Sequence, residues 1–352
     1  MRVVVLGATG NVGTSVVRAL DADPAVDSIV GVARRAPGEP GVGKTEYRVA
    51  DIRVDPLDDL FDGADAVIHL AWLIQPSRDQ ALLRAVNVEG SRRVFAAAGR
   101  ARVPALVYAS SVGAYSPGPK DRAVGEDWPT EGIATSFYAR HKTEVERELD
   151  VFERDHPATR VVRLRPALIF KREAASEIRR YFAGRLLPAT LVRRELVPVV
   201  PAIDRLRFQA VHGDDVGEAY RLATVRDVRG AFNVAAEPVL DPPELGRLLG
   251  ARPVRVPERA LRAAVDATWR LRLQPTPPGW LDLALGVPLM DVRRARGELG
   301  WTPVHGAGEA LLELVDAMRR GDGLQTAPLA PGGAGPLRLR ELLTGVGARS
   351  RD

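Results

Sequence analysis

The chain has 352 residues, of which 45% are hydrophobic, enough for one large α/β domain or a core domain with a smaller appendage. Fifty basic and 45 acidic residues give a net charge of +5 and are interleaved, so we expect no nucleic-acid partner. The lack of cysteine excludes disulfides and thiolate chemistry, and no uncharged apolar run is long enough to cross a bilayer. Because the first predicted strand begins at residue 2, we expect no signal peptide and a cytoplasmic location without membrane attachment.

A glycine-rich turn follows a short apolar strand at residues 3–6 and leads into a helix. The turn contains Gly7, Gly10 and Gly13, spaced G-x-x-G-x-x-G rather than the commoner G-x-G-x-x-G. Glycine permits positive φ and lets backbone N–H groups approach a pyrophosphate at the start of the helix. The other interpretation is a turn that only packs a helix on a strand. Because the glycine-rich turn lies between a strand and a helix, we favour the dinucleotide site.

Arg34 and Arg35 directly follow the second predicted strand, residues 28–33. In a dinucleotide site, the residue at this distance from the glycines contacts the adenosine ribose. An acidic residue there binds the 2′-hydroxyl of NAD, whereas an arginine pairs with the 2′-phosphate of NADP. Two arginines and no acid favour NADP over NAD. The alternative is a solvated pair of arginines in an arginine-rich chain.

Strand and helix signals alternate through residue 170. After residues 28–33, strands are predicted at 47–50, 65–71, 104–111 and 160–170, and helices at 82–98 and 135–153. This alternation predicts a Rossmann-type doubly wound parallel sheet at residues 1–170. His69 lies inside a buried strand and is interpreted as a packed core histidine.

The alternation breaks after residue 170, which predicts a smaller mixed substrate-binding region at residues 171–320. Strands are expected at 208–211 and 231–234, helices at 214–224, 291–300 and 308–319, and proline-punctuated helical pieces at 242–280. Residues 321–352 are rich in Gly, Pro and Ala and are expected to form a mobile tail, with a short amphipathic helix at 337–343.

Tyr138 and Lys142 form a Y-x-x-x-K pair that lies on one face of the helix predicted at 135–153. A nearby ammonium favours the phenolate form of tyrosine, and lysine also has donors for a ribose hydroxyl. The chain contains only four lysines, so one at this position carries more information than usual. A chance pair on an exposed helix is the other interpretation.

Ser111 ends the predicted strand 104–111, where a doubly wound sheet places its ligand. A serine hydroxyl there can donate to a substrate carbonyl as negative charge develops on the oxygen. The other interpretation is a small polar residue that merely ends a strand. No cluster of metal-ligating residues is visible in the sequence.

The chain resembles the NAD-dependent epimerase/dehydratase family of extended short-chain dehydrogenases/reductases over about residues 1–320. The motifs that carry the resemblance are GATGNVG at 7–13, DI at 51–52, HLA at 69–71, NVEGS at 87–91, YASSVGAY at 108–115, YARHK at 138–142, LRPALIF at 164–170, HGDDVGEA at 212–219 and ELGWTP at 298–303.

The resemblance implies roles for individual residues. A catalytic set would contain Tyr138 as the acid/base, Lys142 as its partner and ribose ligand, Ser111 polarising the substrate and Asn87 supporting the geometry. Cofactor contacts would come from Gly7, Thr9, Gly10, Asn11, Val12 and Gly13 at the pyrophosphate, from Asp51 and Ile52 at the adenine, and from Leu70, Ala71 and Pro166 further inside. Family membership also implies a possible homodimer.

Several positions depart from the sugar-nucleotide members. Leu168 stands where they have Asn, Ser116 replaces a glycine, and Trp72 follows HLA. We therefore expect an oxidoreductase that transfers hydride between NADP(H), or NAD(H), and a small-molecule carbonyl or secondary alcohol of smaller size or lower polarity. The alternatives are a sugar-nucleotide epimerase or dehydratase that retains NAD, for which arginines between residues 171 and 207 could bind a diphosphate, and a non-catalytic dinucleotide sensor.

Overall fold

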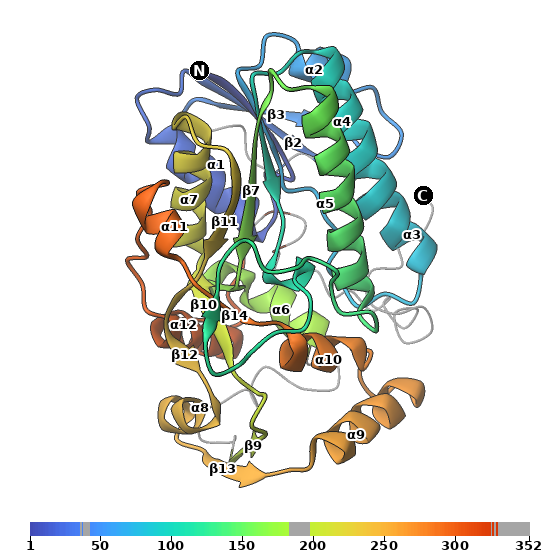
Figure 1. Ribbon diagram of the computed structural model, residues 1–352, viewed down its shortest axis with the longest axis vertical. Coiled ribbons are helices and arrows are strands. Elements are labelled where there is room, and N and C mark those ends of the chain that lie inside the picture. Colours follow the sequence, from blue (N-terminus) through green and yellow to red (C-terminus); the bar gives the residue numbers. More distant parts are fainter. Residues whose placement is uncertain (36, 38–42, 183–197, 325, 327–328, 330–352) are drawn as a thin grey trace.

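The computed structural model describes residues 1–352 except 36, 38–42, 183–197, 325, 327–328 and 330–352. Within the described residues, seven parallel strands form one sheet in the order β11-β7-β5-β4-β1-β2-β3 (Figure 1). They are β1 (Arg2–Leu6), β2 (Ser28–Ala33), β3 (Thr45–Val49), β4 (Ala66–His69), β5 (Ala105–Ala109), β7 (Arg160–Pro166) and β11 (Gly230–Val234). The strand order reverses between β1 and β4, so the sheet is doubly wound in the Rossmann manner.

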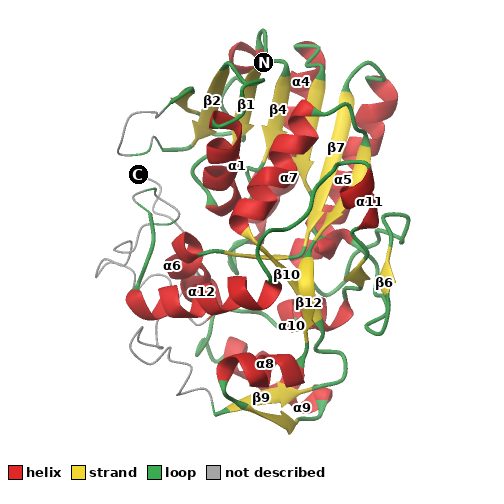
Figure 2. Cartoon of the chain, turned by 90° about the vertical axis from the view of Figure 1, so that its left-hand side faces the viewer, coloured by secondary structure: helices red, strands yellow, loops and turns green. Residues whose placement is uncertain are grey.

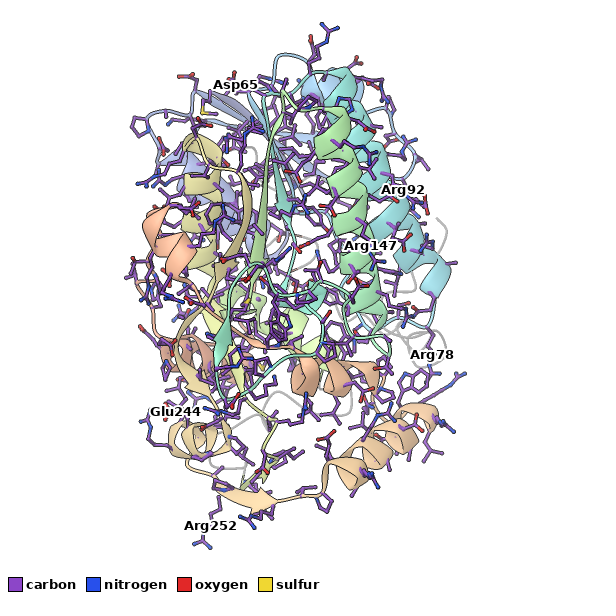
Figure 3. The ribbon with its side chains drawn as sticks, in the orientation of Figure 1. Asp65, Arg78, Arg92, Arg147, Glu244 and Arg252 are labelled. Carbon is purple, nitrogen blue, oxygen red and sulfur yellow. The ribbon has the colours of Figure 1, made fainter. Side chains whose placement is uncertain are left out.

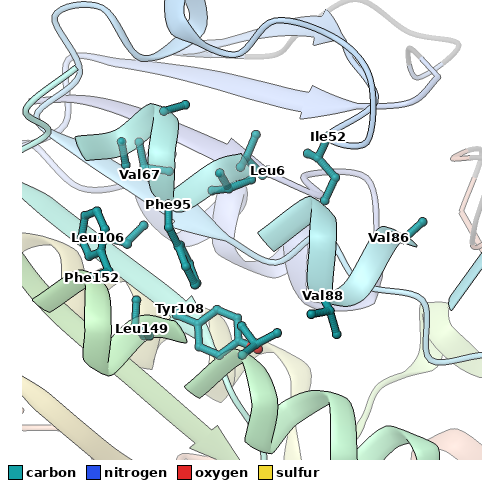
Figure 4. Close-up of a cluster of buried hydrophobic side chains, with 14 of the residues drawn as sticks. Leu6, Ile52, Val67, Val86, Val88, Phe95, Leu106, Tyr108, Leu149 and Phe152 are labelled. Atoms are coloured by element: carbon teal, nitrogen blue, oxygen red, sulfur yellow. The ribbon is translucent and has the colours of Figure 1, made fainter. Parts of the chain in front are cut away.

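Helices cover both faces of this sheet (Figures 1 and 2). One face carries α1 (Asn11–Asp21), α7 (Gly213–Val225) and α11 (Arg293–Gly297), and the other carries α2 (Asp58–Phe61), α4 (Gly90–Arg100) and α5 (Phe137–Asp155). Val3 and Val5 of β1 pack in the cluster on the α1 and α7 side, whereas Val4 and Leu6 pack in the cluster on the α4 and α5 side. Figure 4 shows this second cluster with Leu6 labelled. Burial on both faces explains why β1 is apolar at successive positions rather than alternating.

The helix predicted at residues 82–98 is present but interrupted. It consists of α3 (Gln80–Arg84), a π-helical turn (Ala85–Glu89) and α4. Such turns insert one extra residue into a helix, and sequence periodicity does not distinguish them from the α-helix around them.

The prediction of a single strand over residues 160–170 was wrong. β7 ends at Pro166, and after Ala167 the chain enters a second sheet as β8 (Leu168–Phe170). β8 pairs with β10 (Phe208–His212), which pairs with β12 (Ala236–Leu240). Both sheets bury apolar side chains, so the apolar run continues where the chain changes sheet.

Two further pairs of strands complete the described part of the chain. β9 (Val199–Ala202) pairs with β13 (Arg252–Arg255), and the two-residue strands β6 (Ala123–Val124) and β14 (Leu289–Met290) pair with each other. The helices around them are α6 (Ala175–Phe182), α8 (Pro242–Leu249), α9 (Glu258–Arg270), α10 (Gly279–Gly286) and α12 (Ala307–Arg320). Short 3-10 turns occur at Val112–Ala114 and Arg172–Ala174.

Capping residues define the ends of several of these helices. The Asp241 carboxylate accepts a hydrogen bond from the Glu244 amide at 3.0 Å and starts α8, which ends at Gly250 with φ of +68°. α12 likewise ends at Gly321 with φ of +72°, a conformation that glycine adopts without strain. Of the helix predicted at 291–300, only α11 is helical, so this helix is shorter than expected.

Among the described helices, none is long and apolar enough to span a membrane. Most of the predicted tail, including the amphipathic helix predicted at 337–343, lies outside the described residues, as does segment 183–197.

Candidate active site

A cavity of about 1490 Å³ opens at the carboxyl ends of β1, β2, β4, β5 and β7. Sites for single ligands usually have about 300–1,000 Å³, so this cavity has room for two ligands side by side. Ligands of open α/β sheets bind at this edge, where the strand order reverses. The cavity therefore lies where the sheet topology predicts it.

The glycine turn forms one end of the cavity. Gly7 has a φ of +86°, and its amide donates to the Val32 carbonyl at 2.8 Å. A Cβ atom at Gly13 would lie 2.1 Å from the Gly7 carbonyl oxygen, so α1 can pack this closely only with glycine there. Gly10 caps α1 without a side chain, and the first turn of the helix carries no acidic residue. The first turn of α1 is thus not covered by a side-chain cap.

The predicted cofactor-binding residues come together along this cavity. Its lining includes every member of the predicted set: Gly7, Thr9, Gly10, Asn11, Val12, Gly13, Arg34, Arg35, Asp51, Ile52, Leu70, Ala71, Tyr138, Lys142 and Pro166. Residues at or just after the ends of five different strands therefore line the same cavity. Their contacts with a cofactor stay predictions.

Arg53 is a neighbour of this set that the sequence reasoning missed. Its guanidinium holds the Asp51 carboxylate, with Nη2 and Oδ2 2.6 Å apart. Partial burial by itself would raise the pKa of Asp51, but the hydrogen bonds from Arg53 and the charges of Arg53 and Arg34 hold that pKa below its ordinary value. The Asp-Ile-Arg order in the sequence was the available signal. The ionised Asp51 sits amid arginines at this end of the cavity.

Ser111, Tyr138 and Lys142 lie on the wall beyond the glycine turn. Ser111 follows β5, and its Oγ accepts a hydrogen bond from the Gly113 amide at 3.0 Å, which leaves its own proton to donate elsewhere. Ser136 caps α5, so Tyr138 lies in the first turn of that helix and Lys142 one turn later. A Cβ atom at Gly113 would lie 2.9 Å from the Tyr138 ring, so glycine allows the turn after β5 to approach the phenol.

Burial shapes the acidity of the Tyr138 and Lys142 side chains. It raises the pKa of Tyr138 to about 12, and the hydrogen bond with Ser111 opposes this rise. It also lowers the pKa of Lys142 well below the ordinary value, against the opposing charge of Glu146. Desolvation disfavours the charged form of each group, so the surroundings shift both equilibria toward neutral side chains.

Asn87 is buried behind this wall and does not line the cavity. Its side-chain oxygen accepts from the Leu73 amide at 2.7 Å, and its side-chain nitrogen donates to the Leu73 carbonyl at 2.9 Å. The π-helical turn carries Asn87, so this irregular turn serves to fix the segment after β4. Asn87 thus fits a supporting position rather than one in contact with a ligand.

His69 is packed in the core, as the sequence indicated. Its Nε2 lies 2.8 Å from the Ser91 hydroxyl, and burial, with a contribution from the Lys142 charge, lowers its pKa to about 3. The imidazole is therefore neutral at physiological pH. It supports the sheet and does not line the cavity.

A buried ion pair lies directly behind the wall and was not anticipated. Glu146 follows Lys142 by one helical turn and binds Arg165 through both carboxylate oxygens, at 2.9 and 2.6 Å. The Ser110 hydroxyl donates to the same carboxylate, and Arg165 also donates to the Tyr115 hydroxyl at 3.0 Å. Tyr138, Lys142 and Glu146 are spaced four residues apart in the sequence, and this spacing could have indicated that Glu146 lies on the same helix face as the other two.

Two indole rings flank the Tyr138 phenol. The Trp280 ring centre lies 5.3 Å from that of Tyr138 and is tilted by 32°, and the Trp72 ring meets the phenol edge to face at 6.1 Å. Trp72 lines the cavity, which favours the interpretation as a wall near the reacting end over core packing alone. Trp280 comes from α10, far along the chain, and no local pattern singled it out.

No group of three or more potential metal ligands occurs in the part of the chain that the structure describes.

Comparison with known proteins agrees with the fold. A structure of UDP-glucose 4-epimerase from Thermus thermophilus, solved with NAD, has a TM-score of 0.68 and 23% identity, with 91% of this chain and 99% of that one covered. An uncharacterized protein of Mycobacterium tuberculosis is 26% identical over 327 residues, which cover 92% of this chain but 31% of that protein. The chain thus spans about a third of that relative.

L-arabinose 1-dehydrogenase (NAD(P)+) of Haloferax volcanii is 36% identical over 111 residues, which cover 31% of this chain and 41% of that enzyme. Residues 3–235 match the NAD dependent epimerase/dehydratase family, a stretch that includes the glycine turn, Ser111, Tyr138 and Lys142. The chain belongs to this family of enzymes.

Proposed function

We propose that the chain is an NAD(P)-dependent oxidoreductase that interconverts a carbonyl compound and a secondary alcohol. The observation that carries this proposal is the position of Ser111, Tyr138 and Lys142 on one wall of a cavity whose other end is the glycine turn. This arrangement brings a proton donor and acceptor next to a site for a dinucleotide.

The residues at the glycine turn fit a dinucleotide. The start of α1 has no side-chain cap and no acid in its first turn, and Gly10 leaves its backbone uncovered. These features suit a pyrophosphate, which backbone N–H groups and the helix dipole attract. When bound, the cofactor would supply or accept the hydride.

The side chains of this chain would then manage the proton and the geometry. Ser111 would donate its hydroxyl proton to the substrate oxygen and stabilise the negative charge that develops there. Tyr138 would deliver a proton to that oxygen during reduction and remove it during oxidation. Lys142 would hold a ribose hydroxyl and favour the phenolate, and Asn87 would keep the segment after β4 in place. Most of the rate enhancement would come from this positioning.

We further propose that NADP is preferred over NAD. Arg34 and Arg35 line the cavity where β2 ends, and Asp51, the acid nearest this end, is held by Arg53. A carboxylate engaged in this way competes poorly for a 2′-hydroxyl, whereas the arginines suit a 2′-phosphate.

A second candidate function is a sugar-nucleotide epimerase or dehydratase that retains NAD. It is favoured by the similarity in fold to the Thermus thermophilus epimerase that was solved with NAD. The departures at Leu168, Ser116 and Trp72 weigh against it, and the sensor alternative is disfavoured because a sensor has no use for Ser111, Tyr138 and Lys142 together.

The first test is titration of the purified protein with NADPH and NADH, followed by fluorescence, together with assays of carbonyl reduction. Saturable NADPH binding and release of oxidised cofactor in step with product support the proposal. Cofactor that co-purifies and does not exchange during turnover supports the epimerase or dehydratase. Failure to bind either cofactor contradicts both.

A further inference from the structure

Beyond Tyr138, the cavity continues into a half that is walled mostly by carbon atoms. We call this the apolar half; it is formed by the segment after β4, by β8 and β10, and by the inward faces of α6, α9, α10 and α12. Its lining includes Phe208, Val265, Leu281, Leu311, Val315 and Met318. These side chains come from elements far apart in the chain, so their convergence is a property of the fold and not of one segment.

Charged groups in the cavity lie mainly outside this half. Of the described residues that line the cavity, the cations are Arg34 and Arg35 at the end of β2 and Lys142 beside the phenol. In the apolar half, the charged residue among the described lining is Glu177 of α6. A diphosphate is bound by arginine or lysine, and the described lining of the apolar half offers neither.

Two basic residues near this half, Arg205 and Lys120, bind backbone carbonyls and are not part of the cavity lining. Leu206 and Phe208 line it, whereas Arg205 between β9 and β10 donates from Nε to the Leu285 carbonyl at 3.1 Å. Lys120 lies behind α10 and donates to the carbonyls of Arg207 and Ala284, at 2.8 and 2.9 Å. Burial, followed by the charges of Arg205 and Arg207, lowers the pKa of Lys120 to about 7, so this site already disfavours its charge.

The indoles of Trp72 and Trp280 place flat apolar surfaces directly beside the reacting phenol. Such surfaces suit the rings or chains of an apolar substrate and exclude water from the phenol, in keeping with the raised pKa of Tyr138. Among its described lining residues this half has amides and hydroxyls but no cation, so a diphosphate would lose part of its hydration there without gaining a charged partner.

We infer that the substrate is an uncharged ketone or secondary alcohol with a large apolar body, a chain or fused ring of at least six carbons beyond the reacting carbon. This inference rests on the proposed function and specifies its substrate class. The oxygen would lie at Ser111 and Tyr138, and the apolar body would extend toward α9 and α12.

The test measures binding and turnover separately. Binding of the 2-alkanones from 2-butanone to 2-decanone is measured by calorimetry on the Tyr138→Phe variant loaded with reduced cofactor, in which turnover of the ketone should be about 10²–10⁴-fold slower. Each buried methylene contributes about 0.8 kcal/mol, so Kd should fall up to about fourfold per carbon until the chain fills the apolar half. UDP-glucose in the same assay is the polar competitor and should bind more weakly than 2-decanone.

A pair of variants on α9 locates the binding. Val265 lines the cavity, whereas Ala263 is exposed on the opposite side of α9, and no residue of this helix is buried. Both Val265→Asn and Ala263→Asn should therefore fold. In the Tyr138→Phe background, Val265→Asn should weaken 2-decanone binding about fivefold and 2-butanone binding little, and Ala263→Asn should change neither.

The outcomes separate the two proposals. A Kd that is flat along the series, or tighter binding of UDP-glucose than of 2-decanone, overturns the apolar substrate class whether or not the wild-type protein reduces ketones. Chain-length-dependent binding without turnover of any ketone or alcohol by the wild type supports an apolar ligand and contradicts the oxidoreductase. Equal effects of the two asparagine variants also overturn the inference.

Discussion

The Lys142 ammonium lies 3.5 Å from the centre of the Trp72 ring and donates a hydrogen bond to the Ala109 carbonyl at 2.6 Å. Burial opposes the charge of this lysine, and the face of an aromatic ring attracts a cation. Trp72 therefore stabilises the charged form of Lys142. The residue after the HLA motif is thus connected to the proton chemistry as well as to the shape of the cavity.

Replacing Trp72 by Leu should shift the pH dependence of catalysis. Loss of a cation–π contact of about 0.5–2 kcal/mol lowers the pKa of Lys142 further, so the alkaline limb of kcat should move to lower pH by about 0.5–1.5 units. The measurement is kcat for carbonyl reduction against pH. Trp72→Phe keeps an aromatic face and should shift the limb less; superimposable profiles for wild type and Trp72→Leu would show that the contact has no such effect.

Replacing Tyr138 by Phe should lower kcat by about 10²–10⁴ while the Kd for reduced cofactor changes little. With a pKa of about 12, the phenol of the free protein is protonated at neutral pH and ready to donate during reduction. Oxidation of an alcohol needs the phenolate, so its rate should rise with pH below this value. Tyr47→Phe, on β3, is the matched control and should retain activity; an active Tyr138→Phe variant would remove Tyr138 from the mechanism.

Two glycines of the first turn should respond differently to alanine. A Cβ atom at Gly13 would lie 2.1 Å from the Gly7 carbonyl oxygen, whereas a Cβ atom at Gly10 would lie 3.4 Å from that oxygen, an ordinary contact. Gly13→Ala should therefore lower the melting temperature strongly. Gly10→Ala should leave it within a few degrees but raise the Kd for NADPH at least about tenfold, about 1.4 kcal/mol, because the methyl group covers the start of α1. Unchanged affinity in a folded Gly10→Ala variant would argue against a pyrophosphate there.

Removing the buried carboxylate of Glu146 should destabilise the protein. Glu146→Ala leaves the Arg165 guanidinium buried without its partner, and the free energy of unfolding should fall by about 3–5 kcal/mol in urea titrations at pH 7. Glu148, further along α5, binds Arg92 of α4 at a partly exposed position, and Glu148→Ala should cost about 0–1 kcal/mol. Equal losses in the two variants would contradict the importance of the buried pair.

The same pair makes stability depend on acid pH. Burial by itself would raise the pKa of Glu146, but the hydrogen bonds and charge of Arg165 and the Ser110 hydroxyl hold it below its ordinary value of 4.5. A carboxyl group with a lowered pKa in the folded state contributes stability above the unfolded value, and this contribution is lost as the pH falls through the folded value. Unfolding midpoints of the wild type should thus fall more steeply below pH 4.5 than those of Glu146→Ala.

The variant Arg34→Ala/Arg35→Ala should lose its preference for NADPH. Removal of the two guanidinium groups at the end of β2 should raise the Kd for NADPH by about 10–100-fold and leave that for NADH nearly unchanged, since charge-assisted bonds contribute about 1.5–3 kcal/mol. Arg48→Ala, on β3 beside Glu46, is the control for a general loss of positive charge. A wild type that binds NADH more tightly than NADPH would contradict the proposed preference.

Local patterns were sufficient to predict the part of the site that is built from neighbouring residues. The strand, glycine turn and helix at residues 2–21 follow one another directly, and Tyr138 and Lys142 share a face because of the helical repeat. Trp280 beside Tyr138 depends on how α10 docks on α5, which no local pattern specifies. The change of sheet after Pro166 likewise depends on β10, whose pairing with β8 is set by packing between distant segments.

The helix α9 combines two properties that rarely occur in one element. No residue of it is buried, yet Val265 and Thr268 line the cavity. It is held by polar contacts: Arg262 pairs with Asp282 of α10, and Arg78 donates to the Trp269 carbonyl and lies over its ring. Figure 3 shows Arg78 beside this helix. Substitutions on this helix can therefore change which molecules fit the cavity at little cost to folding. Related chains can diversify in substrate range by exchanging this one wall, while the sheet and the residues around Tyr138 stay as they are.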